Sequence, residues 1–385
     1  MRPTRIDPTS SCAYVGEPMR ISLSDYERDA TAVLEPMVHG YYAGGAEDEA
    51  TLRWNREAFG RVRLLPRVLR GVGERTTATT VLGTTIRTPV MVAPMAFQRM
   101  AHPEGELATV RGAGRAGTVM VTSTLATTPL EEIAEAATEP LWFQLYVYRD
   151  RGATRELVER AAAAGYQALV LTVDTPVLGS REREARGGFR VPDTLPLQEG
   201  PSSLARYAHR HLDPDLTWDD VVWLRSVTSL PVVVKGVVHP DDARLAVEAG
   251  AAGIVVSNHG GRQLDGAVAT LDALPGVAAG AAMAGGAEIY LDGGVRRGVD
   301  VLRALALGAR AVLVGRPILW GLALEGDQGV ERVLEILTSE FSRALALCGL
   351  RSPQEAMQEG AGLLGPTPSP PSAHRPPFPG AGGSS

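Results

Sequence analysis

The chain has 385 residues, of which 44% are hydrophobic and 21% charged, as in soluble globular proteins built on one large core. Its net charge of -6 argues against a nucleic-acid surface and favours small-molecule chemistry. Two cysteines, Cys12 and Cys348, are too few for a disulfide framework or a cysteine-rich metal site. We therefore expect a reducing, cytoplasmic setting and no metal. No apolar run reaches the ~18 residues of a membrane span, so no membrane partner is expected.

The first 88 residues are predicted to form an N-terminal helical extension. Residues 1–20 are polar and irregular. Helices are expected over 25–43 and 48–59 from their apolar periodicity. Within residues 61–88, turn signals alternate with Thr-rich runs, and this pattern predicts a short antiparallel hairpin.

From residue 89 to about 350, apolar runs alternate with helical segments, which predicts a parallel sheet. Eight such units favour a closed (β/α)8 TIM barrel, an α/β fold, over an open sheet. The expected strands are Pro89–Ala96, Thr118–Thr124, Leu141–Val147, Ala168–Thr175, Leu230–Val237, Gly253–His259, Glu288–Gly293 and Ala311–Arg316. The clearest helices between them are expected at Glu104–Ala116, Thr154–Ala164, Pro240–Ala249 and Val299–Leu307.

Two segments interrupt or follow the barrel. An insertion over 183–215, after the fourth strand, is rich in Pro, Gly and charge and is expected to act as a lid over the mouth. Residues 331–347 are predicted to form the closing helix. The tail over 351–385 turns Pro-, Gly- and Ser-rich, so we expect it to be disordered.

The most informative stretch is 252–266. A buried apolar run, 253–256, is followed by Ser257, Asn258, His259, a Gly-Gly pair and Arg262. In a parallel barrel, the carboxyl ends of the strands carry the active site. Histidine supplies a base near neutral pH, and arginine a cation whose fork matches a carboxylate. The block therefore predicts a catalytic site.

Lys235 is the only lysine in the sequence, although Lys and Arg together number 38. Only two asparagines occur, Asn55 and Asn258. A lysine retained in so arginine-rich a chain indicates a place where the wider guanidinium does not fit. It follows the apolar run 231–234, at the end of a predicted strand.

Polar residues at the other strand ends complete the predicted site. Asp174 can pair with His259, raising the pKa of the imidazole and orienting it as a base. Arg181 and Arg262 can grip one carboxylate, and the hydroxyls of Tyr41 and Tyr146 can reach a substrate oxygen. The neutral partners for a polar heterocycle are Ser123, Gln144 and Thr172.

The last two strands end in phosphate-type turns, Asp292-Gly-Gly-Val-Arg296 and Gly315-Arg316. Glycines expose backbone amides, a helix begins there, and an arginine adds charge. Phosphates commonly bind at strands seven and eight of such barrels. A phosphorylated cofactor is therefore expected, with Lys235 placed to stabilise negative charge on its ring.

These motifs resemble the FMN-dependent α-hydroxy-acid oxidase and dehydrogenase family. The resemblance runs from about residue 41 to 347 and includes Ser257–Asp265, Tyr-Tyr-Ala-Gly-Gly-Ala, Ala-His-Pro-Glu-Gly-Glu, Gln-Leu-Tyr, Thr-Val-Asp-Thr-Pro and Asp-Gly-Gly-Val-Arg-Arg-Gly. It implies an FMN flavoprotein, usually a homotetramer, that oxidises an L-2-hydroxy acid to a 2-keto acid, with O2 or another electron acceptor.

The same resemblance implies roles for the site residues. His259 is the base, Asp174 supports it, and Tyr146 and Lys235 complete the catalytic set. The substrate would contact Tyr41, Tyr146, Arg181, His259 and Arg262. FMN would be held by Pro94, Met95, Ala96, Ser123, Gln144, Thr172, Lys235, Ser257, Asp292, Gly293, Gly294, Arg296, Gly315 and Arg316.

Three alternatives stay open on the sequence. One is a dehydrogenase of the same family with a non-oxygen acceptor. Another is an FMN barrel of the isopentenyl-diphosphate isomerase type, which would need diphosphate ligands in place of two carboxylate-facing arginines. A catalytically dead ligand-binding barrel is the third. Leu125 stands where glycolate oxidases carry a Trp, so we expect a substrate bulkier than glycolate, such as lactate, a medium-chain acid or a mandelate-type acid.

Overall fold

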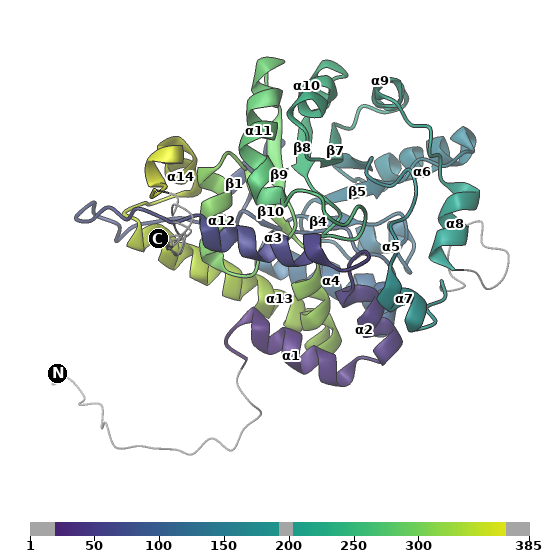
Figure 1. Cartoon of the computed structure of the whole chain (residues 1–385), viewed down its shortest axis with the longest axis horizontal. Coiled ribbons are helices and arrows are strands. Elements are labelled where there is room, and N and C mark those ends of the chain that lie inside the picture. The colour runs from purple at the N-terminus through teal and green to yellow at the C-terminus, as the bar shows by residue number, and fades with distance from the viewer. Residues whose placement is uncertain (1–19, 192–202, 367–385) are drawn as a thin grey trace, which may run out of the picture.

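The computed structural model describes residues 20–191 and 203–366. Within them, eight parallel strands close into a barrel in which β10 pairs with β3, as the sequence predicts (Figure 1). The strands are β3 (Val90–Val92), β4 (Met120–Thr122), β5 (Leu141–Leu145), β6 (Ala168–Thr172), β7 (Val232–Val237), β8 (Gly253–Val256), β9 (Glu288–Leu291) and β10 (Ala311–Val314). Each lies inside its predicted run and most end earlier, because the residues beyond leave the ladder to form the loops of the site.

Helices surround the barrel, because strands of a parallel sheet are apolar on both faces and need an outer cover. They are α4 (Gly105–Ala116), α5 (Leu130–Glu135), α6 (Arg151–Ala163), α9 (Trp218–Val227), α10 (Pro240–Glu248), α11 (Thr270–Met283), α12 (Gly298–Ala306) and α13 (Arg316–Leu347), with a 3-10 turn η1 at Gln98–Met100. The closing helix is longer than predicted. It begins at Arg316 and is kinked at Glu325 and Gly326, whose φ is 58°.

Apolar side chains fill the inside of the barrel. An apolar cluster inside the strands includes Trp142 and Tyr290, whose rings meet edge to face at 5.4 Å. The predicted hairpin, β1 (Thr79–Val81) and β2 (Thr84–Ile86), joins this cluster. In the turn of this hairpin, Leu82 N donates a hydrogen bond to the side chain of Glu288, at the start of β9. The hairpin therefore closes the amino end of the barrel and leaves the carboxyl end for the site.

The N-terminal extension departs from the prediction at one point. One helix over 25–43 is wrong: α1 (Leu23–Val33) and α2 (Pro36–Ala43) are separate. Pro36 causes the break, since it lacks an N–H and suits only the first turn of a helix. The third helix, α3 (Ala50–Arg61), matches the expected position closely. Figure 1 shows α1 and α2 lying beside α13, whereas α3 packs against α11.

The insertion after β6 contains α7 (Glu182–Arg186) and α8 (Leu204–His211). Residues 192–202 of the proposed lid lie outside the described residues, and its lid function stays a prediction. Disorder from residue 351 is wrong for the part that is described, where α14 (Pro353–Glu359) and a 3-10 turn η2 (Gly360–Leu363) follow the barrel. Leu364 there pairs with Leu64 in a β-bridge. Residues 367–385 lie outside the described residues.

No helix in the described ranges is long and apolar enough to cross a membrane.

Candidate active site at the carboxyl ends of the strands

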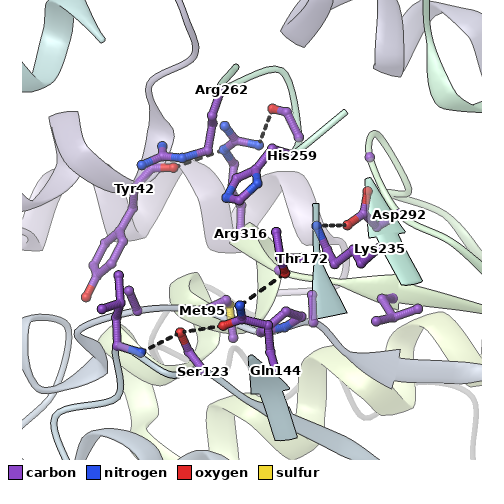
Figure 2. Close-up of a pocket in the computed structure, with 18 of the residues that line it drawn as sticks. Tyr42, Met95, Ser123, Gln144, Thr172, Lys235, His259, Arg262, Asp292 and Arg316 are labelled. Carbon is purple, nitrogen blue, oxygen red and sulfur yellow. Dashed lines mark hydrogen bonds and ion pairs between the residues drawn. The ribbon is translucent and has the colours of Figure 1, made fainter. Parts of the chain in front are cut away.

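A cavity opens at the carboxyl end of the barrel, and most of the predicted site residues line it (Figure 2). Those on its wall are Tyr41, Pro94, Met95, Ala96, Ser123, Gln144, Tyr146, Thr172, Arg181, Lys235, His259, Arg262, Asp292, Gly293, Gly294, Arg296, Gly315 and Arg316. Asp174 and Ser257 are not part of the cavity wall formed by the described residues. Both lie behind it, where they contact His259 and Lys235.

His259 and Asp174 form the predicted pair. The two atoms His259 Nδ1 and Asp174 Oδ1 lie 2.9 Å apart. His259 has a φ of 58°, uncommon for a residue with a side chain, and its backbone N–H donates to Ser257 Oγ at 3.1 Å. This held backbone turns the imidazole toward the cavity while Asp174 fixes the ring from behind.

The net pKa shift of the imidazole differs from the prediction. Burial lowers the pKa of His259, and although Asp174 acts in the opposite direction, the net value lies below 6.5. The predicted effect of Asp174, which raises this pKa, is present, but burial outweighs it. Burial would raise the pKa of Asp174, but His259 and Lys235 hold it below its ordinary value. The pair therefore consists of a neutral base and an ionised carboxylate near neutral pH.

Lys235 lies on the cavity floor with 4% of its surface exposed. Its ammonium donates to Ser257 Oγ at 2.9 Å and lies 3.2 Å from Asp292 Oδ2. Figure 2 shows Lys235 and Asp292 pointing toward each other from neighbouring parts of the barrel. Burial would lower the pKa of Lys235, but Asp292 and Asp174 raise it above its ordinary value. The Lys235 side chain on the floor is therefore protonated near neutral pH, paired with Asp292.

A band of neutral hydrogen-bonding groups crosses three adjacent strands. Gln144 accepts from Ser123 Oγ at 3.2 Å and from Thr124 N at 3.1 Å. Its amide Nε2 donates to Thr172 Oγ1 at 3.0 Å. The band provides donors and acceptors without net charge, which suits one edge of a polar heterocycle.

Two arginines attach the N-terminal extension to the site. Arg262 Nη1 donates to the carbonyls of Tyr41 at 2.7 Å and Gly44 at 2.9 Å, at the end of α2. Arg316 donates to the carbonyls of Tyr42, Gly44 and Gly260. These bonds carry the Tyr41 ring into the cavity, 5.0 Å below the Arg262 guanidinium.

Arg181 reaches the same region from the insertion. Its Nε and Nη2 lie 3.4 Å from Arg262 O and Gln263 Oε1. Burial, and then repulsion from Arg181, lower the pKa of Arg262 to about 10. Two buried guanidinium groups in one region favour a bound anion. Glu184 Oε2 lies 3.6 Å from Arg181 Nη1, and the grip on a substrate carboxylate stays a prediction.

The turn after β9 and the start of α13 form the phosphate-type end. Gly293 and Gly294 have φ of 88° and 90°, and a Cβ on Gly294 would lie 2.0 Å from Asn55 O, so a glycine is required there. Arg296 and Arg316 line the same end of the cavity, and the N-terminus of α13 begins beside them.

Polar atoms without partners test whether FMN fits. Asp292 Oδ1 and Arg296 Nε are buried and have no hydrogen-bond partner within the described part of the chain. Such orphaned atoms are costly unless a ligand satisfies them. A phosphate-binding end, a cationic floor and a neutral polar band match, in turn, the phosphate, the reducible ring edge and the ring heteroatoms of FMN.

Apolar side chains also line the cavity as an apolar wall, namely Leu125, Leu178, Leu204, Tyr207, Ala208 and Leu212. Of these, only Leu125 was singled out from the sequence. Leu204, Tyr207 and Ala208 recur at helical spacing on α8 and are buried, so the periodicity of that segment was the available signal.

The role of Glu106, whose side chain is fully buried, was also not predicted from the sequence. This carboxylate accepts from Gln98 N and from Thr127 N, Thr127 Oγ1 and Thr128 Oγ1, at 2.7–3.2 Å. It thereby ties the loop after β3 to the loop after β4. Glu106 ends the Ala-His-Pro-Glu-Gly-Glu motif, but its role could not be predicted, because the four donors come from two separate loops.

Comparison with known proteins gives a consistent picture. The model of the family described as FMN-dependent dehydrogenase matches residues 30–361. The chain is 52% identical to an L-lactate oxidase from Nostoc sp., covering 87% of this chain and 96% of that protein. It is 49% identical to human 2-hydroxyacid oxidase 1, covering 87% and 94%.

Solved structures agree. A mandelate oxidase structure with (S)-4-hydroxymandelic acid superposes with a TM-score of 0.84 at 44% identity, covering 88% of this chain and 98% of that chain. The family match spans both the barrel and the extension that supplies Tyr41. The chain belongs to the FMN-dependent dehydrogenase family.

Proposed function

We propose that this protein is an FMN-dependent oxidase that converts an L-2-hydroxy acid into the 2-keto acid. The observation that carries the proposal is the His259–Asp174 pair at 2.9 Å beside the two arginines, at the carboxyl end of the barrel. FMN, when bound, supplies a two-electron acceptor. Overall, the acid loses two electrons and two protons, and O2 takes them up as H2O2.

The chain's own residues divide the work. Arg181 and Arg262 bind the substrate carboxylate and so place carbon 2. His259 accepts a proton from the substrate, and Asp174 stabilises the imidazolium that forms. The hydroxyls of Tyr41 and Tyr146 contact substrate oxygens; burial raises the pKa of both, so they stay protonated donors.

Residues of the cofactor side hold FMN. The turn Asp292–Arg296 with Gly315 and Arg316 would receive the phosphate, whereas Ser123, Gln144 and Thr172 would bind the ring. The Lys235 ammonium would favour negative charge on the ring by Coulomb attraction. Pro94, Met95 and Ala96 would complete its binding site.

We propose a substrate with an apolar side chain larger than the hydrogen of glycolate. The support is the apolar wall, in which Leu125 and Leu212 are buried and face the same cavity as His259. Related proteins named L-lactate oxidase, 2-hydroxyacid oxidase and mandelate oxidase are consistent with this class.

Anaerobic mixing of the FMN-loaded protein with glycolate, L-lactate, L-2-hydroxyoctanoate and (S)-mandelate tests the proposal. The yellow flavin should bleach, fastest with a bulkier acid, and recover on addition of air with formation of H2O2. Bleaching without recovery in air would favour a dehydrogenase with another acceptor. No bleaching with any 2-hydroxy acid would contradict the function.

A homotetramer in the cytoplasm completes the proposal. Val68 and Leu69, between α3 and β1, are 78% and 102% exposed. Exposed apolar side chains of this size are common at subunit contacts. Light scattering after gel filtration should give four times the chain mass of 40.7 kDa, and Leu69→Asp should lower it. A monomeric wild-type protein would contradict this part.

A further inference from the structure

The only two asparagines of the chain, Asn55 and Asn258, are hydrogen-bonded to each other. Each side-chain amide donates to the other's Oδ1 at 2.8 Å. Both side chains are buried, at 1% and 7% exposure, although they are 203 residues apart in the sequence. Asn55 lies in the middle of α3, and Asn258 directly precedes His259.

Each amide also holds backbone groups of the site. Asn258 Oδ1 accepts from Gly261 N at 3.1 Å, and Asn258 Nδ2 donates to Val268 O at 3.0 Å. These bonds brace the turn in which His259 adopts its φ of 58°. The Asn258 side chain therefore fixes the turn that carries the base.

Asn55 holds the turn after β9 in the same way. Its Oδ1 accepts from Thr270 N at 3.2 Å, and Thr270 Oγ1 donates to Asp292 O at 2.6 Å. A Cβ on Gly293 would lie 3.2 Å from Asn55 Nδ2, and one on Gly294 only 2.0 Å from Asn55 O. The turn that lines the phosphate-type end is thus packed directly on α3.

We propose that the Asn55–Asn258 pair is a positioning device that sets the His259 turn and the Asp292–Gly294 turn relative to each other. Only an amide offers a donor and an acceptor at the two facing positions, so neither Asp nor Ser can replace it at neutral pH. This explains why both asparagines persist in a chain that has no others. The inference rests on the proposed function in one respect: that one turn carries the catalytic base and the other binds the FMN phosphate.

Asn55→Asp is the sharpest test. Its ionised carboxyl places an oxygen against Asn258 Oδ1, but a protonated carboxyl donates there as the amide did. Titrating FMN into the apo-protein by fluorescence quenching should show binding on the order of tenfold weaker than wild type at pH 8. The ratio of the variant's dissociation constant for FMN to that of wild type should fall toward one as the pH is lowered to about 5.5. The reason is that burial against an acceptor raises the pKa of the new carboxyl.

The charged groups around the turn, Asp292, Arg296 and Arg56, are common to both proteins, so the ratio cancels their contribution. Asp265→Asn is the matched control. The Asp265 carboxylate accepts from Ala50 N and Thr51 N and anchors the start of the same helix, away from the Gly293 turn. Asp265→Asn should lower the melting temperature, and the ratio of its dissociation constant for FMN to that of wild type should not depend on pH.

Asn55→Ala keeps the test usable if the charged variant does not fold. It should weaken FMN binding on the order of tenfold with no change of the ratio between pH 8 and 5.5. Wild-type FMN affinity in Asn55→Ala, or the same ratio at every pH in Asn55→Asp, would overturn the proposal. Because FMN binding is measured without any hydroxy acid, failure here is distinguishable from failure of the proposed reaction.

Discussion

Lys235 Nζ and Asp292 Oδ2 lie 3.2 Å apart at the cavity floor, joining β7 to the residue that follows β9. The ammonium also donates to Ser257 Oγ, which in turn receives the backbone N–H of His259. The chain's single lysine therefore occupies a narrow buried place where a wider cation would displace either Asp292 or the turn that holds the base.

Lys235→Arg should be damaging although the charge is kept. The guanidinium spreads its charge and does not fit between Ser257 and Asp292, so FMN binding should weaken roughly tenfold, and the flavin midpoint potential should fall. Apo-protein titration and redox titration measure the two quantities. Wild-type values for both would mean that the lysine is an accident of composition.

Arg262→Lys should raise the KM for the hydroxy acid on the order of 10- to 100-fold, because an ammonium cannot replace the two-pronged contact. It also removes bonds to the carbonyls of Tyr41 and Gly44, so kcat should fall as well. Arg181→Lys should raise KM with a smaller loss of kcat. Arg183→Lys, at an exposed ion pair with Glu49, is the control and should leave both constants unchanged.

The reaction should lose rate at acid pH. Burial lowers the pKa of His259 in the free protein, so kcat/KM should be constant near neutral pH and fall as the pH drops through this lowered pKa and the base is protonated. Asp174 acts to raise this pKa, so in Asp174→Asn the acid limb should move to lower pH while the plateau drops. An acid limb that shifts to higher pH in this variant would contradict the arrangement.

Leu125→Trp should narrow the cavity and favour glycolate over bulkier acids, by roughly tenfold in the ratio of their kcat/KM values. Leu264→Trp, at a 73% exposed position, is the matched control and should not change the ratio. An unchanged ratio in Leu125→Trp would separate Leu125 from substrate choice.

The sequence predicted the barrel well, because the strands are short, mostly apolar runs with polar residues at or near their carboxyl ends, as at Val256 followed by Ser257. The same rule located His259 and Asp292 after their strands and Lys235 within the second half of β7. It could not place Ser257 and Asp174 behind the cavity wall, because sequence spacing does not show depth.

Contacts between segments that are distant in the chain could not be predicted from the sequence. The apolar wall on α8 and the buried carboxylate Glu106 depend on how separate loops pack, and no local pattern records that. The net pKa shift of His259 could not be predicted for a related reason. The partner Asp174 and its raising effect are readable from the sequence, but the extent of burial, which decides the sign, is not.

The most direct measurement is the rate of anaerobic flavin reduction in His259→Ala at saturating hydroxy acid, with FMN binding measured in parallel. FMN should remain bound with near wild-type affinity, while reduction slows by a factor on the order of 10² to 10⁴, as expected when a general base is removed. Reduction at close to the wild-type rate in the FMN-loaded variant would contradict the assignment of His259 as the base.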